Sequence, residues 1–333
     1  NPLGGQHMAR AQTQFESFHR TILFGYDSSQ DLRDRRDTLV ADLKKNISAD
    51  APPYTTFTQG SYALDTGIHP LDGNPDMDIG VLFECSPDDY PDPLVLKKYV
   101  RDALERHNRT VNIRRPCVTV TYYRDEAPLH HIDLAVYCSN AAGQTQIAWC
   151  RESTSLADRE WKPSEARELT EKITSQFSGS DRDQFRRCVR ALKRWRDEKI
   201  GHKNTPSIGL TVAAYNWFVP RYDPIDGKPI DLIALRDLVD AMLARWTGSR
   251  LQVHLPVAPH SDLFERMTDN QMTDLKSRLE ELRDALNEAD AQADTHEACK
   301  ILRKKFGEDF PVPEKSDTTK QTSAGVSTSG RSA

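Results

Sequence analysis

The 333-residue sequence lacks the features that define several large classes of protein. Its six cysteines form no CxxC pair and no group with histidines, so neither a zinc knuckle nor a dense disulfide framework is indicated. No apolar run reaches the roughly 18 residues needed to cross a bilayer. Neither sign of charge dominates, because 45 Lys+Arg face 50 Asp+Glu and leave a formal net charge of −5. These absences predict a soluble, cytoplasmic protein without a surface for long nucleic acid.

The composition and the hydrophobic periodicity change along the chain and divide it into blocks. Residues 1–7 resemble a vector-derived remnant rather than a signal peptide, and residues 8–50 are expected to form N-terminal helices that pack on the core. Over 51–160, short β-branched or aromatic runs alternate with turn signals, which predicts a mixed α/β sheet with strands near 54–58, 77–83, 118–123 and 131–137. Helical periodicity returns over 161–310, and the Ser-, Thr- and Gly-rich stretch 311–333 is expected to be a flexible tail.

Two carboxylates stand two residues apart at the start of one predicted strand. Asp76 and Asp78 point to the same side of a sheet, because side chains alternate along a strand. Like charges so close repel one another unless a cation lies between them, and oxygen ligands suit Mg²⁺. An isolated Asp-X-Asp also occurs by chance on surface strands, so the pair alone is a weak signal.

A third acid lies inside another predicted strand. In His131-Ile132-Asp133-Leu134 the apolar residues alternate with Asp133, which therefore points away from the core. It could form a rim salt bridge with Arg124, or it could be a third ligand of a two-metal site. His131 and its neighbour His130 are interpreted as structural, since Mg²⁺ prefers oxygen ligands.

A Gly-Ser corner follows the first predicted strand. Gly60 lets the backbone approach a ligand closely, and Ser61 offers a hydroxyl beside free N–H groups, a combination that binds phosphate. The alternative is an ordinary turn in which Ser61 caps a helix.

Together, the Gly-Ser corner, the Asp-X-Asp pair and the single downstream Asp resemble the DNA polymerase β-like nucleotidyltransferase superfamily. Within it, residues 50–220 are similar to the bacterial CD-NTases, relatives of cyclic GMP-AMP synthase and oligoadenylate synthase. The resemblance implies a bilobed α+β fold, with a nucleotidyltransferase core at 51–160 and a helical lobe at 161–310 that closes the nucleotide cleft. It also implies an enzyme that makes a cyclic di- or trinucleotide second messenger from NTPs, ATP among them, in CBASS-type anti-phage signalling.

The resemblance also implies roles for individual residues. The catalytic and metal-binding set would be Asp76, Asp78 and Asp133, holding two Mg²⁺ ions for which Mn²⁺ can substitute. The nucleotide-binding set would be Gln59, Gly60, Ser61, Lys193 and Ser207. Lys193 could instead belong to a solvated basic face, and Ser207 could merely begin or cap its helix. Tyr62 and Trp195 could stack on a base, although the helical spacing of Trp195 also fits a core position.

Other functions stay open at this point. The same fold could serve a transferase that makes linear oligonucleotides or modifies an RNA end or a small molecule. The alternative from another class is a non-catalytic regulatory or conjugated signalling protein, in which the nucleotide site would be vestigial. In some systems of the family a HORMA-domain protein or an E1–E2-like conjugating protein acts on the enzyme, and a tail ending in Ala333 would suit conjugation.

Overall fold

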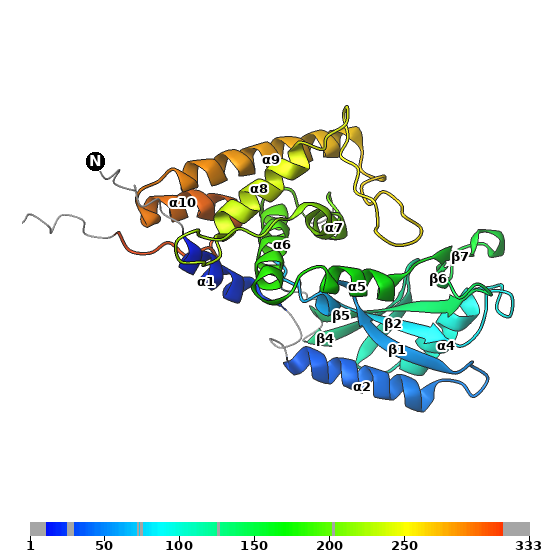
Figure 1. Ribbon diagram of the computed structural model, residues 1–333. Helices are drawn as coiled ribbons and strands as arrows, with labels where there is room; N and C mark the ends of the chain where they lie inside the picture. The colour runs from blue at the N-terminus through cyan, green and yellow to red at the C-terminus, as the bar shows by residue number, and fades with distance from the viewer. Residues whose placement is uncertain are drawn as a thin grey trace, which may run out of the picture.

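The computed structural model describes residues 11–24, 30–71, 73, 76–124, 127–201 and 204–315. Residues 1–7, the expected remnant, and 316–333, most of the expected tail, lie outside these ranges. Figure 1 shows two lobes, one built on a sheet and one built from helices, so the expected bilobed α+β fold is confirmed. The elements in chain order are α1 (Gln12–Ile22), α2 (Gln30–Asn46), β1 (Tyr54–Gln59), α3 (Gly60–Ala63), β2 (Asp76–Phe83), α4 (Leu94–Leu104), β3 (Arg109–Ile113), β4 (Val118–Arg124), β5 (Ala127–Ser139), β6 (Thr145–Trp149), β7 (Glu160–Pro163), α5 (Ala166–Ser175), α6 (Gly179–Lys199), α7 (Ser207–Trp217), α8 (Asp231–Leu243), α9 (Asp269–Asp290) and α10 (Thr295–Phe306).

The sheet has seven strands within the described residues, in the order β1-β2-β5-β4-β3, and β6 and β7 extend it beside the second half of β5. β2 and β5 are parallel, whereas the other neighbouring strands run antiparallel. Parallel neighbours require a long crossover, and here α4 with the β3–β4 hairpin fills it. The four strands expected from the sequence are present, while β3, β6 and β7 were not expected.

One face of this sheet is apolar and is covered by α2 and α4. The two parallel strands contribute alternate residues to it, namely Met77, Ile79, Val81, Ile132, Leu134 and Val136, each at most 1% exposed. Leu39 and Leu43 of α2 belong to the same buried cluster, and Figure 1 shows α2 lying along that side of the sheet. The opposite face is therefore free to carry polar side chains toward the helical lobe.

The helical lobe is organised around α6, a 21-residue helix with a buried face. The face predicted from helical spacing is confirmed, since Phe185, Val189, Leu192 and Trp195 are all at most 2% exposed. Trp195 lies in this core, so the core interpretation holds and stacking on a base is not supported. None of the helices within the described ranges combines the length and the apolar character needed to cross a membrane.

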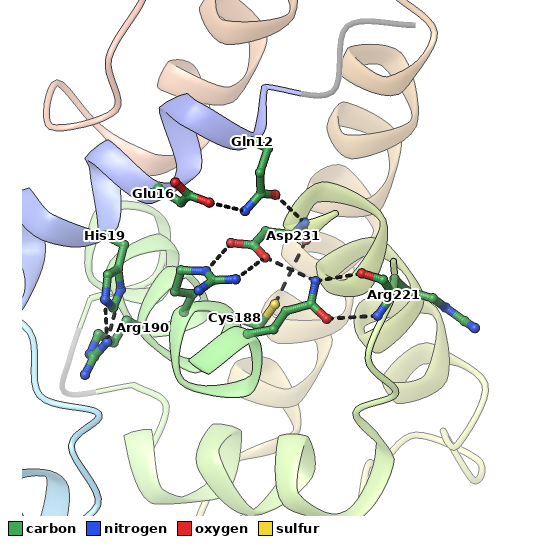
Figure 2. A network of polar contacts seen from close by, with 9 residues as sticks. Gln12, Glu16, His19, Cys188, Arg190, Arg221 and Asp231 are labelled. Atoms are coloured by element: carbon green, nitrogen blue, oxygen red, sulfur yellow. Dashed lines mark hydrogen bonds and ion pairs between the residues drawn. The ribbon is translucent and has the colours of Figure 1, made fainter. Parts of the chain in front are cut away.

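The two N-terminal helices, expected together over 8–50, pack on different lobes. α2 covers the sheet, whereas α1 packs against α6 and α8. A polar network fixes α1 there (Figure 2): Gln12 accepts the backbone N–H of Asp231 over 2.9 Å. Asp231 is 1% exposed at the start of α8 and also accepts from Arg187 of α6 over 2.9 Å. The first described helix therefore belongs structurally to the C-terminal lobe.

Candidate active site

The three acids meet because β2 and β5 are parallel and in a fixed register. Asp76 lies opposite His131, and Asp78 lies opposite Asp133. Residues opposite each other in a sheet point to the same face, so all three carboxylates share the face that the core does not use. Gln59 of β1 lies opposite Asp78 and extends the row by one strand. The period-two argument from the sequence thus places these side chains where the structure has them.

The Gly-Ser corner passes directly over Asp78. Gly60 has φ +68°, a conformation that L-residues rarely adopt. A Cβ added at Gly60 would lie 2.1 Å from Asp78 Oδ2, well inside any normal contact. The backbone can therefore approach the carboxylate this closely only because residue 60 is glycine. Ser61 is not the helix cap considered above, since the cap position of α3 is Gln59.

α6 brings Lys193 to the same place from the helical lobe. Lys193 is 5% exposed, and its Nζ donates to the carbonyl oxygen of Thr66 over 2.9 Å and to Thr66 Oγ1 over 3.1 Å. The Thr66 N–H in turn donates to the carbonyl oxygen of Ser61 over 2.9 Å. Lys193 is therefore tied to the corner through one residue, Thr66, that the sequence did not single out.

All eight residues predicted from the sequence line one cleft of about 370 Å³ between the lobes: Gln59, Gly60, Ser61, Asp76, Asp78, Asp133, Lys193 and Ser207. Ser207 is the first residue of α7 and faces the cleft, so it both begins its helix and belongs to the site. The cleft also contains Leu64, Ile208 and Thr211, which had no signal in the sequence. These three side chains offer apolar surface that an uncharged part of a ligand can contact.

The electrostatics of the cleft are unbalanced. Asp78 keeps some exposed surface, yet burial, followed by the charges of Asp133 and Asp76, raises the pKa of Asp78 to about 7. Burial, followed by the charges of Arg196 and Arg190, lowers the pKa of Lys193 to about 7. Each charge is thus poorly compensated by the protein alone.

The site's donor set fits a divalent cation. Asp133 Oδ1 is buried and has no hydrogen-bond partner, although a buried carboxylate oxygen normally has one. The side chain of Arg124, the alternative partner expected from the sequence, lies outside the described residues. Among the residues described, no three His, Cys, Asp or Glu side chains form a ready-made metal cluster. Mg²⁺ commonly takes one or two carboxylates and completes its shell with phosphate oxygens and water, so an open acidic row agrees with binding together with a substrate.

One further residue, on the same face of the sheet as the acids, orients Gln59. Tyr137 of β5 is 2% exposed, and its hydroxyl donates to Gln59 Oε1 over 2.9 Å. With its oxygen engaged, the Gln59 amide presents its NH₂ group as the donor available to a ligand. No local pattern could reveal this contact, because the two residues are 78 positions apart.

Comparison with known proteins agrees with this geometry. Residues 54–137 match the family described as "Cyclic GMP-AMP synthase DncV-like, nucleotidyltransferase domain". A protein of Salmonella paratyphi B named "Probable cyclic AMP-AMP-GMP nucleotide synthase" is 26% identical over 364 residues, covering 90% of this chain and 92% of that protein.

Two solved structures share the fold. The Bradyrhizobium diazoefficiens CD-NTase CdnG in complex with GTP has a TM-score of 0.67 at 15% identity, covering 88% of this chain and 95% of that chain. The Vibrio cholerae DncV cyclic AMP-GMP synthase, described as a prokaryotic cGAS homolog, has a TM-score of 0.62 at 19% identity, with coverage of 91% and 87%. At these identities the similarity concerns the fold.

The sheet lobe and the helical lobe together have the polymerase β-like fold of these solved structures, and the family match indicates a nucleotidyltransferase domain. Residues 54–137 form a DncV-like nucleotidyltransferase domain, and the resemblance to bacterial CD-NTases indicated by the sequence is confirmed.

Proposed function

We propose that the protein transfers nucleotidyl groups between NTPs and joins two or three nucleotides into a cyclic second messenger. The observation that carries the proposal is the single cleft in which Asp76, Asp78 and Asp133 face the Gly60-Ser61 corner and Lys193. Carboxylates on one wall and phosphate-binding groups on the other are the two parts that a phosphoryl-transfer site needs.

In this proposal the chain's own residues place the reactants. Ser61, Ser207 and the Lys193 ammonium hold the β- and γ-phosphates of the donor. Gln59, oriented by Tyr137, donates to an oxygen of the same nucleotide. Asp76, Asp78 and Asp133 would hold divalent ions, which supply positive charge to the α-phosphate and lower the pKa of the attacking hydroxyl.

The proposed reaction follows from this placement. A ribose hydroxyl oxygen bonds to the donor α-phosphorus, the bond to the β-phosphate oxygen breaks, and pyrophosphate leaves. The hydroxyl proton passes to the Asp133 carboxylate. Holding both reactants in line supplies most of the rate enhancement, because the chemistry needs little beyond position and charge.

The cyclic product is supported by the names of the relatives. The Salmonella protein is named for a cyclic AMP-AMP-GMP product, and a DncV structure is described with the linear intermediate pppA(3′,5′)pG. Use of ATP with Mg²⁺ or Mn²⁺ and a cytoplasmic, CBASS-type anti-phage role are parts of the proposal. A HORMA-type or E1–E2-like partner stays a prediction, since residues 316–333 of the tail lie outside the described part of the chain.

The test is product analysis. The purified protein is incubated with labelled ATP, GTP, CTP and UTP plus Mg²⁺ or Mn²⁺, and the mixture is then treated with phosphatase and analysed by mass spectrometry. We expect a phosphatase-resistant cyclic product that Asp76→Asn and Asp133→Asn do not form. Asp88→Asn, which changes an exposed acid in a turn outside the cleft, is the matched control. An Asp133→Asn protein working at nearly the full rate would sink the assignment, and a phosphatase-sensitive product would indicate a linear oligonucleotide instead.

A further inference from the structure

A further hollow lies in the sheet lobe, where the start of β4 meets the end of β6. It measures about 650 Å³, and its walls are Arg115, Trp149, Arg151 and parts of the segment 153–160 that leads into β7. We call it the Trp149 hollow. It shares no lining residue with the 370 Å³ cleft, so it is a separate surface feature and not an extension of the acidic row.

The Trp149 hollow carries uncompensated positive charge. Within the part of the chain that the structure describes, the exposed guanidinium groups of Arg115 and Arg151 have no ion-pair or hydrogen-bond partner. The two acids on its wall are already engaged, Glu160 by a lysine over 2.9 Å and Asp158 by a serine hydroxyl over 2.5 Å. The wall therefore leaves both arginines without a counter-charge.

Other donors stand beside the two arginines. The Trp149 indole N–H and the Ser153 hydroxyl make no hydrogen bond to any described residue. Lys162 Nζ lies 4.9 Å from the centre of the Trp149 ring. Guanidinium, ammonium, indole N–H and hydroxyl groups can all donate to the oxygens of an anion. This set of side chains favours a ligand with several negatively charged oxygens.

The backbone behind the arginines is held in place from the inside. Lys97 is fully buried, and its Nζ donates to the carbonyl oxygens of Arg115 and Cys150 over 2.7 and 2.8 Å. The Cys150 N–H also donates to the Arg115 carbonyl oxygen over 3.1 Å. On the far wall, Arg159 Nε donates to the Thr154 carbonyl oxygen over 3.0 Å. The segments that form the hollow are thus ordered before a ligand arrives, which lowers the entropic cost of binding.

One arginine of the helical lobe stands at the edge of the hollow. The Arg266 guanidinium, from the segment between α8 and α9, lies 6.0 Å from the centre of the Trp149 ring. Figure 1 shows this segment reaching from the helical lobe toward the side where β6 and β7 lie. That distance is the outer limit of a cation–π contact, so Arg266 can turn toward an anion with little loss.

We propose that the Trp149 hollow binds a polyphosphate anion, either inorganic pyrophosphate or the phosphate chain of a free nucleotide, with its oxygens on Arg115 and Arg151. Two guanidinium groups on separate segments suit a chain of phosphates, because a chain can contact both at once. Arg266 contributes a further positive charge from the helical lobe, so a bound anion connects the two lobes. The proposal does not depend on nucleotidyl transfer in the cleft.

The test is calorimetry with pyrophosphate in buffer stripped of divalent metal. Without metal the acids of the cleft repel an anion, so the heat reports binding in the hollow. Arg115→Ser/Arg151→Ser should bind pyrophosphate about tenfold more weakly than the wild type, or weaker still. The matched control is Arg20→Ser/Arg182→Ser, which removes two exposed arginines from α1 and α6. It has the same change of net charge and should bind like the wild type, since long-range attraction alone changes affinity little.

Two more variants separate the hollow from the cleft. Ser61→Ala/Ser207→Ala alters the cleft alone and should keep the wild-type affinity for pyrophosphate, whereas Arg266→Gln should weaken binding about threefold. No binding by the wild type, unchanged binding by Arg115→Ser/Arg151→Ser, or loss of binding in the cleft variant overturns the proposal. An unchanged affinity in Arg266→Gln overturns the connection between the lobes.

The choice of anion distinguishes the two sources of the phosphate chain. ATP binding about tenfold or more tighter than pyrophosphate would identify a nucleoside triphosphate as the ligand, and similar affinities would identify the phosphate chain alone. AMP carries a single phosphate and should bind about tenfold more weakly than either. If AMP binds as tightly as pyrophosphate, the polyphosphate assignment is wrong.

Discussion

Replacing Gly60 by alanine should separate catalysis from folding. The new Cβ would lie 2.1 Å from Asp78 Oδ2, and contacts below 3.0 Å are essentially absent from real structures. The Asp78 carboxylate must therefore move by about 1 Å, and misplacement of that size in an active site costs roughly 100-fold in rate. The left-handed backbone adds about 1–2 kcal/mol of strain, which the stiffer unfolded chain partly offsets.

Gly143→Ala is the matched control for Gly60→Ala. Gly143 has φ +77° in the turn between β5 and β6, and an added Cβ there would meet nothing within 4 Å. Both variants should lose about 1 kcal/mol in urea unfolding, because both place alanine in the left-handed region. Only Gly60→Ala should lose activity, measured as pyrophosphate release and cyclic product. Equal rates in the two variants would refute the idea that this glycine exists to let the backbone pass over Asp78.

Three further predictions concern charge and hydrogen bonding. Without metal, Asp78→Asn should melt at a higher temperature than the wild type at pH 8 and lose most of that advantage at pH 5. The pKa of Asp78 in the folded wild type is raised to about 7, so the wild type loses stability as the pH rises from 4 to 7. Identical melting temperatures of the two proteins at pH 8 would contradict this. Lys97→Met should destabilise the fold by about 2–5 kcal/mol at pH 7 in urea titrations, since three carbonyl groups lose their donor. Because burial lowers the pKa of Lys97 to about 8 from 10.5, the unfolded wild type binds the extra proton between those values, and its stability should gain about 3 kcal/mol on the variant as the pH rises through that window; a constant difference would speak against it. Tyr137→Phe should lower kcat/KM about threefold to tenfold at nearly unchanged melting temperature, and adding Gln59→Ala should cost little more, whereas additive losses would show that the two residues act independently.

The sequence was informative where a short-range pattern carries the geometry. The spacing of Asp76 and Asp78 sets their common face, because a strand has a period of two whatever surrounds it. The alternation around Asp133 does the same for the second strand. Their meeting followed from the resemblance rather than from the pattern, since nothing in either segment states that the two strands are parallel neighbours in this register.

Other features depend on contacts between distant segments. β3, β6 and β7 are only four or five residues long, and strands so short carry too few alternations to stand out. The division of α1 and α2 between the lobes depends on which apolar face finds which partner, and both faces have ordinary helical spacing. Thr66, Tyr137 and Arg115 acquire their places through partners far away in the chain.

In the cleft without ligands, the pKa of Asp78 and the pKa of Lys193 both lie near 7. Burial and like-charged neighbours raise the pKa of Asp78 and lower the pKa of Lys193, so the fold does not fully stabilise the charged form of either group. A divalent cation on the acids favours the ionised carboxylate, and a triphosphate on the corner favours the ammonium form of Lys193. The cation compensates the negative charge of the acids, and the triphosphate compensates the positive charge of Lys193 and its neighbouring arginines. The phosphates also complete the coordination shell of a cation that the acids alone leave open. Metal and nucleotide should therefore strengthen each other's binding by the same factor, as linkage requires.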